Sequence, residues 1–309
     1  MIKKLWKKTT ALFMLAGMMV LAGCASSAAD TNASADMKTV QTDKGEVQIP
    51  TDPKRIVSDY YLGEFLAVDV KPIIASPYAL QDPFLKDYIE GIEPMNITSA
   101  ETSLEMIVEA DPDLIVTITE ADYEKYSKIA PTVYIQDGKR SDEQLFEYIA
   151  SLVNKEEEAK QYIADFHARA EEMKPAVQQA VDGQTVSIVE VWPQQIYSMG
   201  SHFARGGTIL YDLWDLKAPE IVQKEMVDGS EAYKVVSLEA LPEYTGGYIL
   251  YGVLSDTDPD FVEKSAVWNN LPAVKDGQVF AYDQAGYMHR DPISLSGQMD
   301  QLYAFFTGE

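Results

Sequence analysis

Three aromatic residues and one arginine lie close together in the second half of the chain. Trp192, Tyr197 and Phe203 precede Arg205, and two glycines follow that arginine. Arginine offers fixed, always-charged hydrogen-bond donors, aromatic rings offer flat apolar surface, and glycines let the backbone come close to a ligand. These residues are therefore candidates for contact with a small-molecule ligand. A surface arginine in a loop is the simpler alternative.

Other candidate ligand contacts follow strand-like runs, and open α/β sheets bind ligands at the carboxyl ends of their strands. In the first half, each candidate tyrosine could equally well lie in the hydrophobic core or line a ligand-binding cleft. In the second half, Arg290 could pair with Asp291 or meet a ligand carboxylate. The candidates are Tyr60, Tyr61, Tyr78, His202, Tyr287 and Arg290.

No metal or catalytic centre is expected. His167, His202 and His289 are spread along the chain, and with a single cysteine they make no plausible zinc set. The sequence contains no nucleophile elbow, phosphate loop or dinucleotide fingerprint. We therefore predict no enzyme activity, no bound cofactor and no metal ligated directly by the protein.

The amino-terminal residues predict export and lipid attachment. Four lysines before residue 9 precede an apolar run from Ala11 to Val20, which is short for a membrane span but typical of a signal peptide. Leu21-Ala22-Gly23-Cys24 matches the bacterial lipobox, although a chance cysteine behind an ordinary cleavage site is the alternative. We predict a signal peptide over residues 1–23, a lipidated Cys24 (diacylglycerol, palmitate) and a disordered tether over residues 24–40.

The acidic balance excludes one large class of function. The chain has 25 basic and 49 acidic residues, and loss of the lysine-bearing signal peptide would make it more acidic still. Nucleic-acid binding needs basic patches, so it is not expected. The length after the tether suits one large domain or two lobes of ordinary size.

A repeated unit supplies the elements that would position these residues. Ser103-Leu104-Glu105 and Ser237-Leu238-Glu239 each open a short helical pattern, and an apolar strand starts eleven residues after each serine. The serines are expected to cap, with Glu105 and Glu239 in the first helical turn. Strands alternating with helices predict an α/β fold with mostly parallel sheets, in lobes over residues 41–153 and 182–309. The strand candidates are Arg55–Val57, Leu114–Ile118, Thr132–Ile135, Val186–Val191, Tyr248–Tyr251 and Val279–Tyr282.

A single long helix over residues 154–181 is predicted to join the lobes. This stretch is rich in helix formers, and Tyr162, Ile163, Phe166 and Ala170 make one apolar face. Pro175 is expected to kink it or to end its regular part. At 1.5 Å per residue it would reach about 40 Å, enough to run across both lobes. A helix packed within one lobe is the alternative.

The order of these parts resembles the helical-backbone class of ABC-importer substrate-binding proteins, which bind ferric siderophores, haem and cobalamin. Three stretches carry the resemblance: Pro53–Val57, Glu105–Leu114, and the block from Ile196 through Phe203–Gly207 to Lys217-Ala218-Pro219. The last block is similar to the hydroxamate-siderophore branch, although Phe203 stands where a tryptophan is common.

The resemblance implies that the chain captures a ferric siderophore, most readily of the hydroxamate type, and delivers it intact to a permease pair driven by a cytoplasmic ATPase. It implies ligand contacts from Arg205 and the surrounding aromatics, and contacts from Glu105 and Glu239 to permease arginines. The protein is expected to be a monomer on the outer face of the cell membrane, with a Gram-positive surface favoured.

Several alternatives remain open at this point. Citrate-based siderophores are the nearest rival ligands, ahead of catecholates, haem and cobalamin. A ferric catecholate carries about three negative charges and would want several cations, whereas only Arg205 and Arg290 are evident. A lipid-anchored siderophore esterase and an adhesion or scaffolding lipoprotein are the alternatives from other functional classes.

Overall fold

The computed structural model describes residues 36–96 and 100–309, and of residues 100–102 it describes the backbone alone. The predictions for the signal peptide, for Cys24 and for most of the tether lie outside these residues. All described residues belong to one compact unit, and no helix among them is long and apolar enough to cross a membrane.

Short apolar runs in the first half form a five-stranded parallel sheet, in the order β5-β4-β3-β6-β7. The central strand β3 pairs with β4 on one side and with β6 on the other, through Val57↔Ile74 and Val57↔Ile115. Strand residues buried on both faces are typical of parallel sheets covered by helices, and the sequence predicted β3, β6 and β7 within a residue or two. The elements are β1 (Met37–Thr42), β2 (Gly45–Pro50), β3 (Ile56–Ser58), α1 (Leu62–Leu66), β4 (Ile74–Ala75), η1 (Ala79–Gln81), β5 (Glu93–Pro94), α2 (Ala100–Glu109), β6 (Leu114–Thr117), η2 (Glu120–Asp122), α3 (Tyr123–Tyr126), β7 (Thr132–Tyr134) and α4 (Asp142–Leu152).

A hairpin precedes this sheet, which makes the predicted tether too long. Strand β1 begins at Met37 and pairs antiparallel with β2 across a tight turn at Asp43 and Lys44. Gly45 has φ 110°, a conformation that suits glycine. The alternating pattern of both strands and this turn signal were overlooked, so residues 37–40 were wrongly assigned to the tether.

The second sheet is mixed, with the order β10-β9-β8-β11-β12. Strands β8, β11 and β12 are parallel, as predicted, but β9 reverses directly after β8 and β10 pairs antiparallel with β9. The two-residue connection, with Gln194 at φ 60°, forces this reversal. Four of the five strands run in one direction, and β9 alone is reversed, a reversal that the sequence did not predict. Its elements are β8 (Val186–Trp192), β9 (Gln195–Met199), η3 (Thr208–Leu213), α6 (Glu220–Val222), η4 (Gln223–Val227), β10 (Tyr233–Val236), α7 (Leu241–Tyr244), β11 (Tyr248–Val253), α8 (Asp260–Glu263), α9 (Ala266–Asn270), α10 (Pro272–Lys275), β12 (Val279–Ala281), α11 (Gln284–Tyr287) and α12 (Pro292–Thr307).

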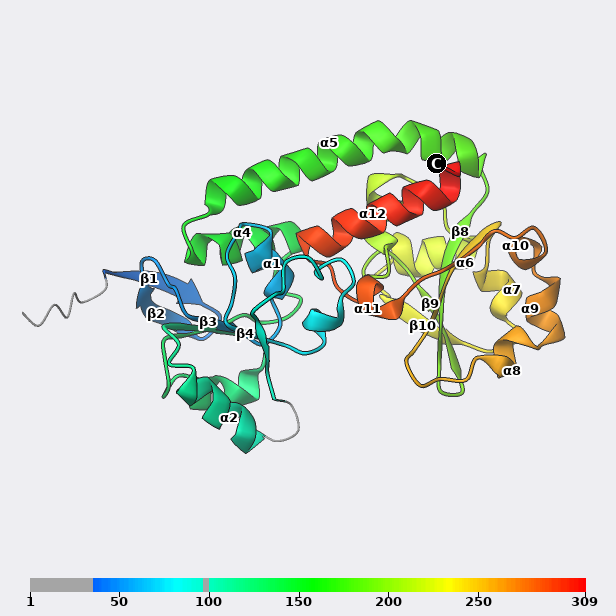
Figure 1. Cartoon of the computed structure of the whole chain (residues 1–309). Coiled ribbons are helices and arrows are strands. Elements are labelled where there is room, and N and C mark those ends of the chain that lie inside the picture. The colour runs from blue at the N-terminus through cyan, green and yellow to red at the C-terminus, as the bar shows by residue number, and fades with distance from the viewer. Residues whose placement is uncertain (1–35, 97–99) are drawn as a thin grey trace, which may run out of the picture. The chain divides into compact units, whose positions relative to one another are not determined.

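One long helix joins the lobes, as predicted. Helix α5 (Glu156–Val181) runs through Pro175 without ending there. It packs on α4 of the first lobe and on α12 and η3 of the second, so the single-lobe alternative is wrong. Figure 1 shows α12 alongside it. Because α12 also contacts α1, a second helix bridges the lobes, which the sequence analysis missed.

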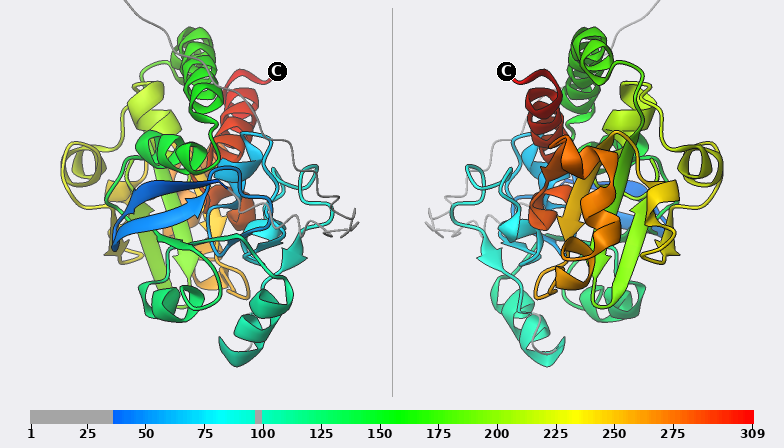
Figure 2. Two further views of the ribbon diagram at one scale, coloured as in Figure 1. Left: turned by 90° about the vertical axis from the view of Figure 1, so that its left-hand side faces the viewer. Right: turned by 90° about the vertical axis from the view of Figure 1, so that its right-hand side faces the viewer.

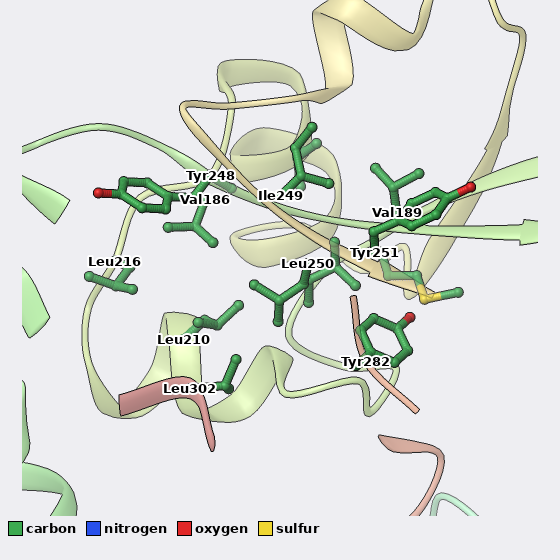
Figure 3. Close-up of a cluster of buried hydrophobic side chains, with 14 of the residues drawn as sticks. Val186, Val189, Leu210, Leu216, Tyr248, Ile249, Leu250, Tyr251, Tyr282 and Leu302 are labelled. Atoms are coloured by element: carbon green, nitrogen blue, oxygen red, sulfur yellow. The ribbon is translucent and has the colours of Figure 1, made fainter. Parts of the chain in front are cut away.

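Each lobe has its own apolar core. In the second lobe, Leu250 of β11 points toward Leu210 of η3 and Leu302 of α12, whereas Val189 of β8 lies on the other face of the sheet beside Tyr251 (Figure 3). The helices that follow β11, coloured orange in Figure 2, lie against this sheet. These cores hold the strand ends in place and so position the side chains that follow them.

Polar groups buried between α1, η1 and α12 tie the two lobes together. The Ser294 hydroxyl lies 2.8 Å from a carboxylate oxygen of Asp82 and also within hydrogen-bond distance of Asp291, which caps α12. Gly63 of α1 is needed for this close approach, because a Cβ there would lie 2.0 Å from the Asp291 carboxyl. Burial raises the pKa of Asp82 to about 7. Burial and then the Asp291 charge raise the pKa of Glu64 to about 8.

The contribution of Asp82 and Glu64 to the free energy of unfolding is therefore expected to fall as the pH rises. Both acids bind protons more tightly in the folded chain than in the unfolded chain, so the stability that they contribute at low pH is lost between about pH 4 and pH 8. Asp82→Asn mimics the protonated acid. The loss of unfolding free energy between low and high pH should therefore be about 2–4 kcal/mol smaller in this variant. Urea unfolding at pH 5 and pH 8 measures it, and equal pH dependence in both proteins would contradict the assignment.

Candidate ligand-binding site

Arg205 lies in a strained turn between β9 and η3. Ala204, Arg205 and Gly206 have φ values of 58°, 61° and 82° in succession. Left-handed conformations are costly for residues other than glycine and persist only where the surroundings enforce them. The Arg205 backbone N–H donates to the carbonyl of Tyr287 at 3.0 Å, and the backbone of Gly207 lies so close to Gly200 that a side chain could not fit. The turn thus fixes the direction of the Arg205 side chain.

Arg205 is buried and paired, whereas the sequence predicted a guanidinium free to meet a ligand. Its Nε lies 2.5 Å from Oε2 of Glu190, and its Nη2 lies 3.2 Å from Oε1. The two-pronged geometry is the strong form of an arginine–carboxylate pair. Nη1 lies outside the pair. The alternative of a surface arginine in a loop is therefore wrong, because β8 places Glu190 directly beside the guanidinium.

Glu190 is the buried partner of Arg205, and the sequence analysis missed it. It is fully buried near the end of β8 and accepts further hydrogen bonds from Trp192 (2.7 Å), Tyr282 (2.8 Å) and Gln284 (3.2 Å). Burial acts to raise the pKa of Glu190, but the bond and charge of Arg205 outweigh burial and hold the pKa below its usual value. The Glu190 carboxylate is therefore ionised, and both of its oxygens accept hydrogen bonds from protein groups. An acid inside an apolar strand run was a signal that a buried partner had to exist.

Four aromatic side chains form a continuous group beside Arg205, here called the aromatic cluster: Trp192, Tyr197, Tyr233 and Phe203. Neighbouring rings have centroids 4.7, 5.5 and 5.0 Å apart in that order. The Arg205 guanidinium lies over the Phe203 ring, 5.4 Å from its centroid. The sequence predicted three of these rings but missed Tyr233, which pairs with Met199 across β10 and β9 and remains 45% exposed. Tyr197 lies in strand β9.

A hollow of about 350 Å³ lies on the first lobe at the carboxyl ends of its strands, as open parallel sheets predict. Tyr60 and Tyr78 line it, and both are well exposed (46% and 58%). Asp59 and Asp122 supply its charged groups. We refer to this space as the N-terminal hollow.

A smaller pocket of about 60 Å³, the interlobe pocket, links this hollow with the second lobe. Tyr60 lines both, and its ring centroid lies 6.4 Å from that of His289. Burial raises the pKa of Tyr60, while the charges of Arg290 and Arg205 lower it.

Four other predicted ligand contacts lie in settings that differ from the prediction: Tyr61, Tyr287, His202 and Arg290. Tyr61 borders the interlobe pocket but is 2% exposed and packs in the core, and Tyr287 is 1% exposed and stacks on Tyr282. His202 is exposed and lies near Asp212, whose pKa is raised by burial and lowered in part by the charge of His202.

Arg290 does not form the predicted pair with Asp291. Its Nε lies 3.4 Å from Asp142 at the start of α4, while Asp291 is occupied in capping α12. The two residues belong to different lobes, a pairing that sequence proximity could not reveal.

Glu105 and Glu239 are both exposed, but their local settings differ from the prediction. Helix α2 starts before Ser103, so this serine is buried inside the helix and is not its cap. Ser237 does accept a hydrogen bond from the Ala240 N–H, in the turn ahead of α7. Glu105 therefore lies within a helix and Glu239 in a turn.

Within residues 36–96 and 100–309, no group of three or more acids, histidines or cysteines is arranged to hold a metal ion. Nε and Nη2 of Arg205 are paired with Glu190, Nη1 lies outside that pair, and the aromatic cluster lies beside it. The arrangement can bind a flat or rounded organic surface that carries oxygen acceptors.

Comparison with known proteins supports the same conclusion. The family model described as periplasmic binding protein matches residues 66–285. The iron(3+)-hydroxamate-binding protein FhuD of Bacillus subtilis is 33% identical over 97% of this chain and 98% of its own length. The iron(3+)-hydroxamate-binding protein YxeB of the same organism is 32% identical over 93% of this chain and 94% of its own length.

A solved structure agrees in fold. The crystal structure of an FhuD fold-family protein from Bacillus subtilis, described as the periplasmic binding component of a Fep/Fec-like ferrichrome ABC transporter, has a TM-score of 0.82. It is 31% identical, and the match covers 87% of this chain and all of that one.

Proposed function

The chain belongs to the periplasmic binding protein family, and from this premise we propose that it binds ferric hydroxamate siderophores for an ABC importer. Members of this family bind and deliver transported molecules and are not enzymes, so the siderophore-esterase alternative is set aside. The observation that carries the proposal is the aromatic cluster beside the Arg205–Glu190 pair, in a chain aligned over 97% of its length with a protein named for hydroxamate binding.

The geometry suits a chelate whose iron is already fully coordinated. A trihydroxamate fills the six positions of the metal with its own oxygens, so the protein needs to supply hydrogen-bond donors and apolar surface. Arg205 would supply donors to the hydroxamate oxygens, and the four rings would cover the organic backbone. The N-terminal hollow would accept the opposite side of the chelate against Tyr60 and Tyr78.

Equilibrium dialysis of the full-length chain tests this proposal. Ferrichrome and ferrioxamine B should be retained at micromolar concentrations or below, ahead of ferric citrate, ferric enterobactin, haem and cobalamin. Preferential retention of haem or cobalamin, or of no compound in the panel, would contradict it.

Tyr233→Ala is expected to weaken binding of a ferric trihydroxamate about two- to tenfold, since an aromatic contact contributes about 0.5–1.5 kcal/mol beyond its buried area. Tyr88→Ala is the matched control, because Tyr88 is equally exposed (44%) but lies outside the cluster and both pockets. Fluorescence titration measures both affinities. Equal affinities in the two variants would remove Tyr233 from the site.

The finer features of the system form part of the same proposal. The protein would act as a monomer, held on the outer face of the cell membrane by lipid on Cys24, and a Gram-positive surface suits it best. Glu105 and Glu239 would meet arginines on the permease pair, whose cytoplasmic ATPase drives import. Cys24→Ala should release the protein into the culture medium, and unchanged retention in the membrane fraction would contradict the anchor.

A further inference from the structure

Glu190 cancels the positive charge that Arg205 would otherwise present to a ligand. The two side chains meet through two hydrogen bonds inside the lobe, and Glu190 is fully buried. A buried charge is tolerated when it is paired and its remaining bonding capacity is filled. Trp192, Tyr282 and Gln284 fill that capacity here. Arg205 therefore offers a hydrogen-bond donor in a pair whose net charge is zero.

The surrounding walls add no positive charge to compensate for this. Described residues lining the N-terminal hollow include two acids and no lysine or arginine. The interlobe pocket is lined by one arginine, Arg290, which lies 3.4 Å from Asp142. Its acidic lining residues are Asp137, Asp142 and Asp291, together with Glu64, whose raised pKa leaves it mostly protonated at neutral pH.

A polyanionic chelate would thus meet a surface that is neutral at Arg205 and acidic elsewhere. At the effective dielectric of a partly buried site, each unpaired charge contact is strong enough to change affinity by more than an order of magnitude. An uncharged chelate, or one with a single positive charge, meets no such penalty.

We propose that Glu190 is the residue that sets the charge selectivity of this site, by neutralising Arg205 so that uncharged and cationic ferric chelates bind and polyanionic ones are rejected. This inference rests on the proposed function. Glu190 acts through Arg205 and is a positioning residue, since its own oxygens are all engaged by protein donors.

The test is the ratio of two dissociation constants, ferric enterobactin (three negative charges) over ferrichrome (uncharged), from fluorescence titration of the full-length chain. In the parent protein this ratio should be large. Glu190→Gln keeps the shape but leaves Arg205 unneutralised, so the ratio should fall at least about tenfold. Glu190→Asp keeps the charge, and its ratio should stay within about threefold of the parent.

A uniform loss of affinity in Glu190→Gln, with the ratio unchanged, would show a purely structural role and overturn the proposal. Tight enterobactin binding by the parent would overturn it too. Failure of the parent to bind ferrichrome and ferrioxamine B would instead contradict the proposed function itself, so the two failures are distinguishable.

The double variant Glu190→Gln with Arg205→Gln keeps the proposal testable if Glu190→Gln does not fold. It leaves no unpaired buried charge, and the site again has no net charge at this position. Its affinity for both chelates should drop while the ratio stays near that of the parent. A tenfold change in the ratio would overturn the proposal.

Discussion

Replacing Arg205 with alanine is expected to lower the free energy of unfolding by about 3–5 kcal/mol, the usual cost of leaving one partner of a buried ion pair alone. The variant leaves Glu190 charged, fully buried and without its main partner. The same change should weaken binding of a ferric trihydroxamate about tenfold to a hundredfold, because a hydrogen bond to a charged donor is lost. Urea unfolding and fluorescence titration measure the two effects.

The double variant Glu190→Gln with Arg205→Gln separates stability from binding. Removing both charges should restore most of the lost stability, since no uncompensated charge remains. Affinity for the chelate should stay low. If Arg205→Ala unfolds like the parent, the Arg205–Glu190 pair is not buried in solution. If Arg205→Ala binds every chelate as tightly as the parent, Arg205 is not part of the binding site.

Charge reversal at Glu105 or Glu239 is expected to abolish siderophore uptake while leaving siderophore affinity unchanged. Both side chains are exposed and lie on separate lobes, outside the aromatic cluster, the N-terminal hollow and the interlobe pocket. Like charges facing each other across an interface cost several kcal/mol. Glu105→Lys and Glu239→Lys should therefore fail to dock on permease arginines. Uptake of ⁵⁵Fe-labelled chelate by cells, with affinity measured on the purified chain, tests both effects.

Glu109→Lys and Glu243→Lys serve as matched controls, because they make the same charge change at exposed sites on α2 and α7. They should import at the parent rate. If uptake falls equally in the control variants, the loss comes from the overall change in surface charge and not from a specific contact with the permease. If affinity falls in Glu105→Lys or Glu239→Lys, their role is structural.

The sequence predicted the two lobes and their joining helix because both depend on local patterns. Apolar runs such as Leu114–Thr117 and Val186–Trp192 are buried on both faces and are recognisable without tertiary information. The reversal into β9 was missed because it depends on a two-residue turn around Gln194, whose backbone conformation is unusual for its residue type.

The candidate site was predicted in part, and its errors have one physical cause. Aromatic and arginine residues can be found by type, but their partners depend on tertiary contacts. Glu190 pairs with Arg205 across fifteen residues and Arg290 pairs with Asp142 from another lobe. Tyr61 and Tyr287 are of the same residue type as Tyr60, and only packing decides that their rings are buried.

The most direct test of the central claim is a fluorescence titration of the full-length chain with ferrioxamine B, with its visible iron absorption recorded throughout. Binding of the intact chelate beside Trp192 should quench fluorescence in a saturable way at micromolar concentrations or below. The iron absorption band should not change, because the protein donates no ligand to the metal. Saturation by a labile ferric salt in place of the chelate, or a shifted iron band on binding, would contradict the account.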